Sequence, residues 1–252
     1  MIPVRIIARL DIKGPNVVKG IQFEGLRIMG KPGEMARHYY EEGADEIIFI
    51  DTVASLYGRD NILSVVKEAA HDIFVPMTAG GGVRTIDDIK ALLRAGADKV
   101  AINTTAVNQP AFIREAANAF GSQCIVLSVH AKRRPEGHWE VYTDNGRERS
   151  HRNVLDWVVE AEELGVGEIL LTSVDREGTK EGYDGELLRE VHSRVQIPVI
   201  AAGGAGCNED IVEVFKTGCA DAVSCATIFH YNLCPLPNLK DAVRAAGMEV
   251  RL

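Results

Sequence analysis

Eight times along the chain, a short apolar run is followed by a longer amphipathic or polar stretch, and this alternation leaves few possible architectures. The apolar runs are rich in Val and Ile and comprise Val4–Leu10, Glu46–Asp51, Phe74–Ala79, Lys99–Asn103, Cys124–Val129, Glu168–Ser173, Pro198–Ala202 and Ala222–Ala226. Near-continuous apolar runs are typical of parallel strands that are covered on both faces. Segments with helical periodicity, such as 32–42, 86–95, 154–164 and 210–217, supply the covering layer. This order predicts an α/β protein with the (β/α)8 architecture of a TIM barrel.

The two halves of the chain also resemble each other at a spacing of about 122 residues. The segment Val75–Gly82 aligns with Ile197–Gly204, and Glu42–Ile48 aligns more loosely with Glu163–Ile169. A repeat of this length indicates two half-barrels rather than a solenoid. Because no linker, low-complexity tract or change of composition interrupts the sequence, residues 1–252 are predicted to form one barrel domain.

Charge and composition exclude several classes of partner. The formal net charge of -8 provides no broad positive field, so no nucleic-acid partner is expected. The apolar runs are far shorter than the roughly 20 residues that span a bilayer, so no membrane partner is expected either. Five cysteines without a C-x-x-C pair or a signal peptide predict reduced thiols in the cytoplasm. No metal or cofactor motif is evident, and none is predicted.

Glycines and hydroxyl side chains recur where strands end, and they predict two sites for phosphate groups. Glycine lets the backbone N–H groups approach phosphate oxygens, and a following helix N-terminus adds partial positive charge. An isolated Gly-Gly pair is equally consistent with a tight turn, but here the same arrangement occurs in both halves. The first half contributes Gly81, Gly82, Asn103 and Thr104; the second contributes Gly178, Thr179, Gly203, Gly204, Ala226 and Thr227.

Titratable residues also follow the strands of both halves. Asp11 ends the first strand and His130 lies at the equivalent place on the fifth, so they are predicted to face each other across the barrel mouth as an acid–base pair. A partly desolvated carboxylate can have its pKa raised toward neutrality. Lys19, on a loop expected to be mobile, could reach over a bound substrate. A capping role for Asp11 and a structural role for His130 remain alternatives, and Asp51 and Asp175 could equally fix loops.

Four charged residues mark the opposite end of the barrel. Arg5, Glu46, Lys99 and Glu168 lie at or near the starts of four strands. Two positive and two negative side chains can pair there. Spacing alone favours solvated strand ends, since exposed ion pairs stabilise proteins little.

Several longer motifs resemble the cyclase subunit family of imidazole-glycerol-phosphate synthase, and the resemblance extends over essentially the whole chain. The segments that carry it are Asp11–Lys13, Val17–Gly20, Tyr40–Glu46, Gly80–Arg84, Ala95–Val100, Gly121–Val126 and Ile228–Tyr231. The resemblance implies a heterodimer with a glutaminase, or amidotransferase, subunit that docks on the N-terminal face of the barrel. It assigns Arg5, Glu46, Lys99 and Glu168 to an ammonia gate and Asp98 to the partner interface.

The same resemblance implies the chemistry. In that family, ammonia reacts with a bisphosphorylated ribotide that is split and cyclised into imidazole glycerol phosphate and an aminoimidazole carboxamide ribotide. Two aspartates act as acid and base. Asp11 matches the first, but His130 occupies the position of the second, and Arg9 replaces a residue that is commonly Cys. Replacing an anion with a neutral or cationic ring weakens the stabilisation of a developing cation.

These departures leave four functional interpretations. The first is a paralogue that passes ammonia to a sugar-amidating pathway for surface polysaccharide, a branch that Gly20–Arg27 and Val53–Arg59 resemble. The second is a cyclase of histidine biosynthesis that tolerates His130. The third is a non-catalytic activator of a glutaminase, with phosphate sites that are inherited but idle. The fourth, the sister isomerase, is weakest because it needs no ammonia gate.

Overall fold

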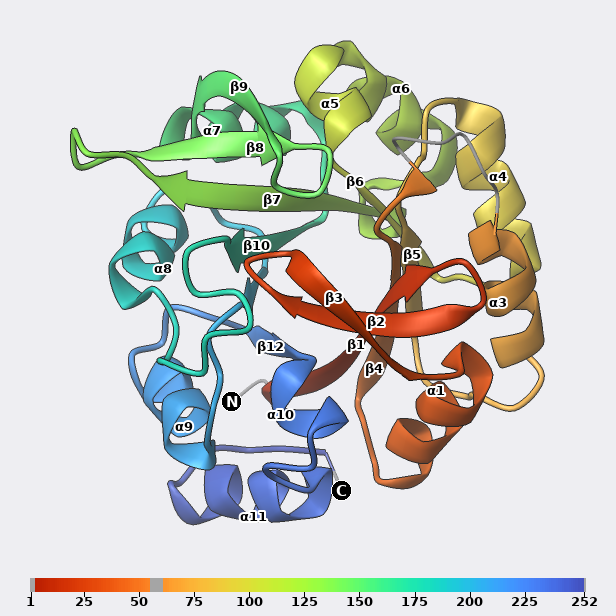
Figure 1. Ribbon diagram of the computed structural model, residues 1–252. Coiled ribbons are helices and arrows are strands. Elements are labelled where there is room, and N and C mark those ends of the chain that lie inside the picture. Colours follow the sequence, from red (N-terminus) through yellow and green to blue (C-terminus); the bar gives the residue numbers. More distant parts are fainter. Residues whose placement is uncertain (1–2, 55–60, 252) are drawn as a thin grey trace.

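Eight parallel strands close on themselves in the computed structural model of the chain, which describes residues 3–54 and 61–251 (Figure 1). The order around the barrel is β10-β11-β12-β1-β4-β5-β6-β7, and β7 pairs with β10 to close it. These strands are β1 (Arg5–Lys13), β4 (Glu46–Asp51), β5 (Met77–Gly80), β6 (Lys99–Ile102), β7 (Ile125–Arg133), β10 (Glu168–Ser173), β11 (Val199–Ala202) and β12 (Ala222–Cys225). Each of the eight apolar runs contains or overlaps one of them, which confirms the predicted (β/α)8 barrel.

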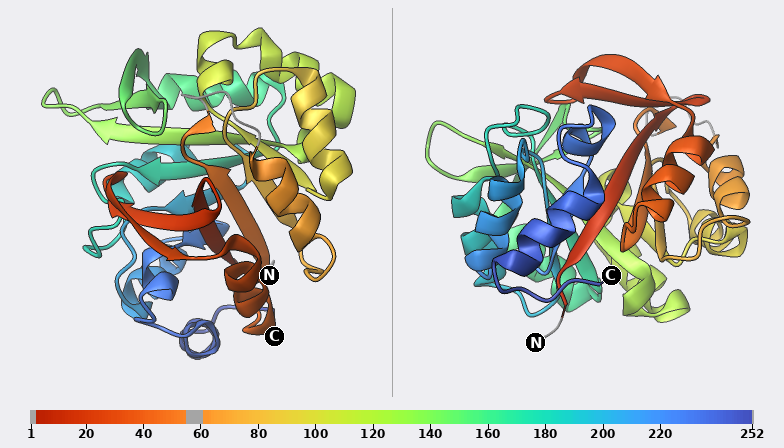
Figure 2. Two further views of the ribbon diagram at one scale, coloured as in Figure 1. Left: turned by 45° about the vertical axis from the view of Figure 1, so that its right-hand side comes forward. Right: turned by 90° about the horizontal axis from the view of Figure 1, so that it is seen from below.

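Helices surround the barrel and cover the outer face of its sheet (Figures 1 and 2). They are α1 (Pro32–Glu41), α3 (Asn61–Ala69), α4 (Ile86–Ala95), α5 (Thr104–Asn108), α6 (Ala111–Phe120), η1 (Ser122–Cys124), α7 (Val154–Leu164), α8 (Gly185–His192), α9 (Asn208–Lys216), α10 (Thr227–His230) and α11 (Leu236–Ala245). Among the described residues, no helix has the length and apolar character needed to cross a bilayer. Residues 55–59 of the segment that resembles the paralogue branch lie outside the described residues.

The local sequence explains why α4 begins and ends where it does. The Thr85 side chain accepts a hydrogen bond from the Asp88 N–H at 3.1 Å, and the Asp88 carboxylate accepts one from the Thr85 N–H at 2.8 Å. This capping box satisfies backbone donors that have no partner within the helix. Gly96 ends the helix with a φ of 117°, a left-handed conformation that suits glycine. Ile89 and Leu92 are buried, and they turn the apolar face of the helix toward the sheet.

The sequence predicts long irregular loops over residues 13–30 and 132–152, but both stretches are mostly β-structure. In the first half, β2 (Asn16–Ile21) and β3 (Glu24–Gly30) form an antiparallel hairpin that continues from β1. In the second half, β8 (Trp139–Thr143) and β9 (Glu148–Asn153) continue from β7 in the same way. Figure 2 shows β2 and β3 at the end of the barrel opposite the two chain termini. The hairpins therefore extend the first strand of each half over the barrel mouth.

Turn chemistry explains why only one of the two hairpins has a sequence signal. Asn145 and Gly146 form a typical hairpin dipeptide, and both have positive φ. The other turn places Gln22 and Phe23 at φ values of 51° and 64°, a conformation that neither residue type announces in sequence. The signal was thus present in the second half and absent from the first.

The glycine turns of the two halves share one backbone conformation. Gly81 and Gly203 both have positive φ, as do Gly82 and Gly204. A Cβ atom at Gly81 would lie 2.2 Å from the Asp51 carbonyl oxygen, and one at the equivalent Gly203 would lie 2.8 Å from the Ser173 carbonyl oxygen. Both distances are too short for any side chain, so glycine is required at equivalent places in the repeat.

Aspartates that precede three of the strands tie neighbouring strands together at the base of the barrel. The side chains of Asp45, Asp98 and Asp221 each accept a hydrogen bond from the backbone N–H of an adjacent strand, at 2.7, 2.8 and 2.9 Å. Asp45 is buried, and its second oxygen accepts a bond from Lys240 of α11 at 2.8 Å. This ion pair joins the last helix to β1 and β4.

We expect Asp45→Ala to lower the free energy of unfolding by roughly 3 kcal/mol, because it leaves the buried Lys240 ammonium without its counterion. Asp241→Ala is the matched control, since the exposed pair of Asp241 with Arg244 should contribute less than about 1 kcal/mol. Denaturant unfolding of both variants measures the difference. Equal losses of unfolding free energy in the two variants would show that the buried ion pair stabilises the fold no more than the exposed one.

Candidate functional site

The four charged side chains at the base of the barrel form a closed ring of ion pairs. Arg5 donates to Glu46 at 2.7 Å and to Glu168 at 2.6 Å. Lys99 donates to Glu46 at 3.0 Å and to Glu168 at 2.8 Å. Each carboxylate therefore contacts both cations, and the formal charges cancel.

This ring is largely shielded from solvent, with side-chain exposures of 5% to 18%. Burial by itself lowers the pKa of Arg5, but the carboxylates of Glu168 and Glu46 outweigh it and raise that pKa. The side chains are thus not the solvated strand ends that spacing alone favoured. Asp98 lies next to the ring on an exposed position, with one oxygen held by the Met77 N–H.

Apolar side chains fill the barrel interior above the ring. They form one buried cluster: Ile7, Ile48, Ile50, Ala101, Val126, Leu170, Ile200, Ala202 and Ala222. Residues of alternating position on a strand face the same side of the sheet. Ile7 therefore faces the interior between Arg5 and Arg9 on β1, and Leu170 does so between Glu168 and Thr172 on β10. An apolar layer separates the charged base from the polar mouth.

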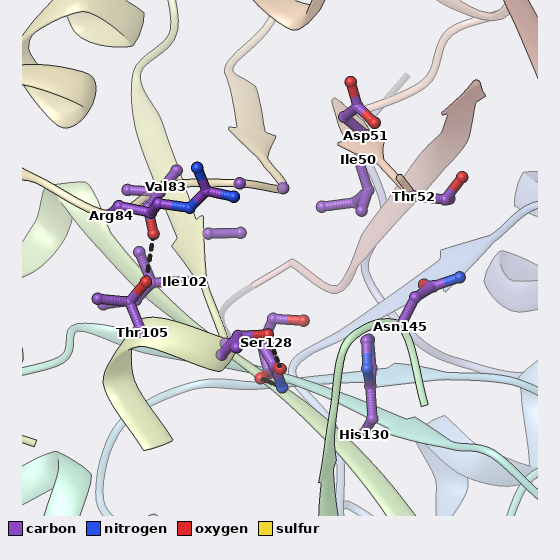
Figure 3. A pocket seen from close by; sticks show the side chains of 15 residues that line it. Ile50, Asp51, Thr52, Val83, Arg84, Ile102, Thr105, Ser128, His130 and Asn145 are labelled. Carbon is purple, nitrogen blue, oxygen red and sulfur yellow. Dashed lines mark hydrogen bonds between the residues drawn. The ribbon is translucent and has the colours of Figure 1, made fainter. Parts of the chain in front are cut away.

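The first predicted phosphate site is a cavity at the mouth (Figure 3). Gly81, Gly82, Asn103 and Thr104 all line it, as do Ser128, His130 and Asn145, which sequence reasoning did not include as phosphate ligands. None of the backbone hydrogen bonds among the described residues uses the Gly82 N–H. This donor is thus available to a ligand. In Figure 3, His130 and Asn145 lie on one side of the cavity and Arg84 and Thr105 on the other.

The second predicted phosphate site is a narrower cavity. Its lining contains Gly178, Gly203, Gly204, Ala226 and Thr227 together with three charged residues, Arg9, Lys19 and Glu177. The Gly204 N–H makes no backbone hydrogen bond with other described residues. We refer to these two cavities as the first and second cradles.

Two details of the cradles differ from the prediction. Thr179 does not line the second cradle; its hydroxyl donates to the Arg176 carbonyl at 2.9 Å and so stabilises the loop. The helices that start at Thr104 and Thr227 span only five and four residues. Such short helices align few peptide dipoles, so their N-termini add little positive charge at the two cradles.

Asp11 lies in the mouth as a paired anion rather than as a neutral acid. Arg9 donates to its carboxylate at 2.8 Å, and the Lys19 ammonium lies 3.8 Å from it. Burial alone would raise the pKa of Asp11, but Arg9 and Lys19 together outweigh burial and lower it. The expectation of a pKa raised toward neutrality was therefore wrong, because two cations share the site.

Lys19 is buried on β2 instead of lying on a mobile loop. Its ammonium forms an ion pair with Glu177 in the second cradle. Burial, together with the positive charge of Arg9 and against the opposing effect of Asp11, lowers the pKa of Lys19 to about 8. The lowered pKa of Lys19 lies closer to neutral pH than that of an exposed lysine.

His130 is a buried, neutral imidazole. Burial, with Arg9 acting in the same direction and Asp11 opposing, lowers the pKa of His130 to about 3. The Phe23 ring, from the β2–β3 turn, packs against it with ring centroids 5.1 Å apart. The Nδ1 atom of His130 has no hydrogen-bond partner among the described residues, so a ligand group could bond to it.

His230 is a mouth residue that sequence reasoning did not select. Its Nδ1 bonds with the Tyr39 hydroxyl at 2.7 Å, and its buried Nε2 has no partner in the described part of the chain. Burial, then Lys19, lowers the pKa of His230 to about 4, with Asp11 opposing. The only sequence signal was its position shortly after the eighth strand.

Asp51 and Asp175 fix loops, which is the role that the sequence indicated as possible for both. Asp51 accepts hydrogen bonds from the Val53 and Ala54 N–H groups, both at 2.9 Å. Asp175 accepts one from the Arg133 N–H at 2.7 Å. No cluster of three His, Cys, Asp or Glu side chains in residues 3–54 and 61–251 is arranged to hold a metal ion.

We expect His130→Gln to become more stable relative to the wild type as the pH falls from 6.5 toward 3. The unfolded imidazole takes up a proton below pH 6.5, whereas the folded one stays neutral to about pH 3, so the wild type loses stability across this window. At pH 5 the relative gain should be on the order of 2 kcal/mol. Urea unfolding at pH 7 and pH 5 measures it, with the exposed His138→Gln as control. A difference between wild type and His130→Gln that does not change with pH would contradict a buried neutral imidazole.

Comparisons with known proteins agree with this geometry. The family described as histidine biosynthesis protein matches residues 5–235. A Legionella pneumophila protein named imidazole glycerol phosphate synthase subunit HisF is 58% identical over 207 residues, covering 82% of this chain and 98% of its own. Proteins of the same name from Streptococcus sanguinis strain SK36 and Streptococcus gordonii strain Challis are each 47% identical over the full length of both chains. The chain therefore belongs to the histidine biosynthesis protein family and, within it, to the barrel type of the imidazole glycerol phosphate synthase cyclase subunit.

Proposed function

We propose that the chain is the ammonia-using cyclase subunit of an imidazole glycerol phosphate synthase. Ammonia would react in the mouth with a ribotide bisphosphate to give imidazole glycerol phosphate and an aminoimidazole carboxamide ribotide. One observation carries the proposal: a neutralised ring of charges at the base is joined through an apolar interior to a mouth with two cradles. The names of the relatives favour this activity over delivery of ammonia to a sugar-amidating pathway.

The apolar interior suits the passage of ammonia and opposes the passage of ions. Transfer of a neutral NH3 molecule from water to an apolar medium costs little free energy. Transfer of an ammonium ion costs much more, because the ion loses its hydration in a medium of low dielectric constant. The ring of Arg5, Glu46, Lys99 and Glu168 would admit the molecule from a glutaminase docked at the base. Asp98, exposed beside this ring, would belong to the interface of that heterodimer.

The two cradles suit a substrate with a phosphate at each end. Free backbone N–H groups at Gly82 and Gly204 would donate to phosphate oxygens, and Thr104 and Thr227 would add their hydroxyls. A ligand held at both ends would have its central atoms between the cradles. Orienting the reacting atoms in this way accelerates a reaction without any covalent step by the protein.

Acid–base chemistry would come from Asp11, Lys19 and His130. Asp11 would stay ionised and stabilise positive charge that develops on the substrate, and Lys19, with a pKa of about 8, would exchange protons. His130 would act as a neutral hydrogen-bonding group, because a pKa of about 3 makes it a weak base. The contribution of an anion at position 130 would therefore be missing.

We expect the purified chain, given an ammonium salt and the ribotide bisphosphate, to form imidazole glycerol phosphate. His130→Asp should raise kcat about tenfold or more, because an added carboxylate stabilises a developing cation in the mouth. Product formation is followed by chromatography, and His138→Asp, an exposed substitution, is the control. A wild type without product would contradict the proposal. Activity that appears only in His130→Asp would then point to another acceptor for ammonia.

We expect Lys99→Met to lower turnover with glutamine about tenfold in the complex with a glutaminase, while turnover with added ammonium changes little. The variant leaves two carboxylates paired with Arg5 alone, and the negative ring would retain ammonia as ammonium. The ratio of the two rates is the measurement, and Lys216→Met on the outer helix α9 is the control. An equal fall in both rates would place the effect of Lys99 outside ammonia transfer.

A further inference from the structure

Arg9 crosses the barrel interior in the same way as Arg5 does. Both lie on β1, and both reach β10, from which β1 is separated by β11 and β12 around the barrel. Arg5 donates to Glu168 at 2.6 Å, and Arg9 donates to Thr172 at 3.2 Å. The two arginines are four residues apart, as are their two partners. The interior is thus spanned twice, once below the apolar layer and once above it.

The upper crossing is held more weakly than the lower one. Arg5 binds two carboxylates and is fixed at both ends. Arg9 has one charged partner, Asp11, through Nε, and its bond to Thr172 is at the long end for a hydrogen bond to a neutral group. Its Nη2 makes no hydrogen bond with the described residues. The Phe23 ring faces the guanidinium, with the Cζ atom of Arg9 5.8 Å from the ring centroid.

Arg9 also belongs to the lining of the second cradle. It shares that cavity with Gly203, Gly204 and Thr227 and with Ser224. Ser224 is 4% exposed, and its hydroxyl has no hydrogen-bond partner among the described residues. A buried hydroxyl without a partner costs free energy unless a ligand satisfies it. The free Nη2 of Arg9 and the free Oγ of Ser224 therefore border the same cavity as the glycine backbone.

We propose that Arg9 is a movable closure of the upper barrel interior. It spans the interior to Thr172 while the second cradle holds no anion, and it turns its guanidinium to a phosphate group that binds there. A dianion offers this side chain two charge-assisted hydrogen bonds in exchange for one long neutral bond. Glu177 does not prevent this, because Lys19 neutralises its carboxylate.

The consequence is that occupancy of the second cradle opens the route from the apolar layer to the mouth. Ammonia would reach the mouth only when a phosphorylated substrate is in place, so little would be lost to solvent. Arg9 is then a positioning residue, which acts through the anion and does not touch the reacting atoms. This inference rests on the proposed function, because the second cradle must be an anion site.

Crystal structures of the whole chain, grown without phosphate or sulfate and then soaked in inorganic phosphate, test the movement directly. We expect a guanidinium nitrogen of Arg9 within hydrogen-bond distance of a phosphate oxygen and no longer on Thr172. Phosphate in the second cradle with Arg9 still bonded to Thr172 overturns the closure and leaves the proposed function standing. An empty second cradle at saturating phosphate contradicts both.

Titration calorimetry with inorganic phosphate measures how much Arg9 contributes to phosphate affinity in solution. We expect Arg9→Met to weaken one of two phosphate sites about tenfold and to leave the other unchanged, since one charge-assisted bond is lost. Arg9→Lys should retain more affinity than Arg9→Met, because it keeps the charge. Arg37→Met, an exposed substitution on α1, is the matched control. Unchanged affinity at both sites in folded Arg9→Met overturns the proposal, and circular dichroism verifies the fold.

Discussion

The structure depends on pairing charges that face the inside of a closed barrel. An unpaired ion in such an interior would cost several kcal/mol, so each inward charge needs a partner. At the base, Arg5 and Lys99 share Glu46 and Glu168. These four residues lie on four different strands, so the closure of the sheet holds the ring together. In the mouth, Asp11 pairs with Arg9 of its own strand and with Lys19 of β2.

The balance of charges in this mouth differs from that of a mouth with two aspartates. Arg9 adds a cation and His130 removes an anion. Burial raises the pKa of Asp11, but the charges of Arg9 and Lys19 outweigh it and lower that pKa, whereas burial lowers the pKa of His130 to about 3. The two departures act together: His130 is kept neutral partly by Arg9, and Asp11 is kept ionised mainly by Arg9. The mouth therefore stabilises positive charge less strongly and attracts anions more strongly than a site with two carboxylates.

The duplicated half-barrel explains why related functional groups occur in pairs. Glycine turns with positive φ follow β5 and β11, and hairpins follow β1 and β7. The two cradles nevertheless differ in the charged residues that line them. Asp51 and Arg84 line the first, whereas Arg9, Lys19 and Glu177 line the second. The two halves thus share a backbone arrangement but differ in the side chains around it.

The sequence by itself determined the barrel, its eight strands and the residues at the strand ends, because local apolar periodicity and glycine turns are set by neighbouring residues. It also predicted the glycines and hydroxyl side chains that line both cradles, apart from Thr179, but not Ser128 and Asn145 in the first or Glu177 in the second. Only the tertiary structure decided which charges pair, that Lys19 is buried on a strand of the first hairpin, and that Arg9 crosses the interior to Thr172. These features join residues up to 195 positions apart, and the pKa shifts in the mouth arise from burial and from electric fields that no local pattern encodes.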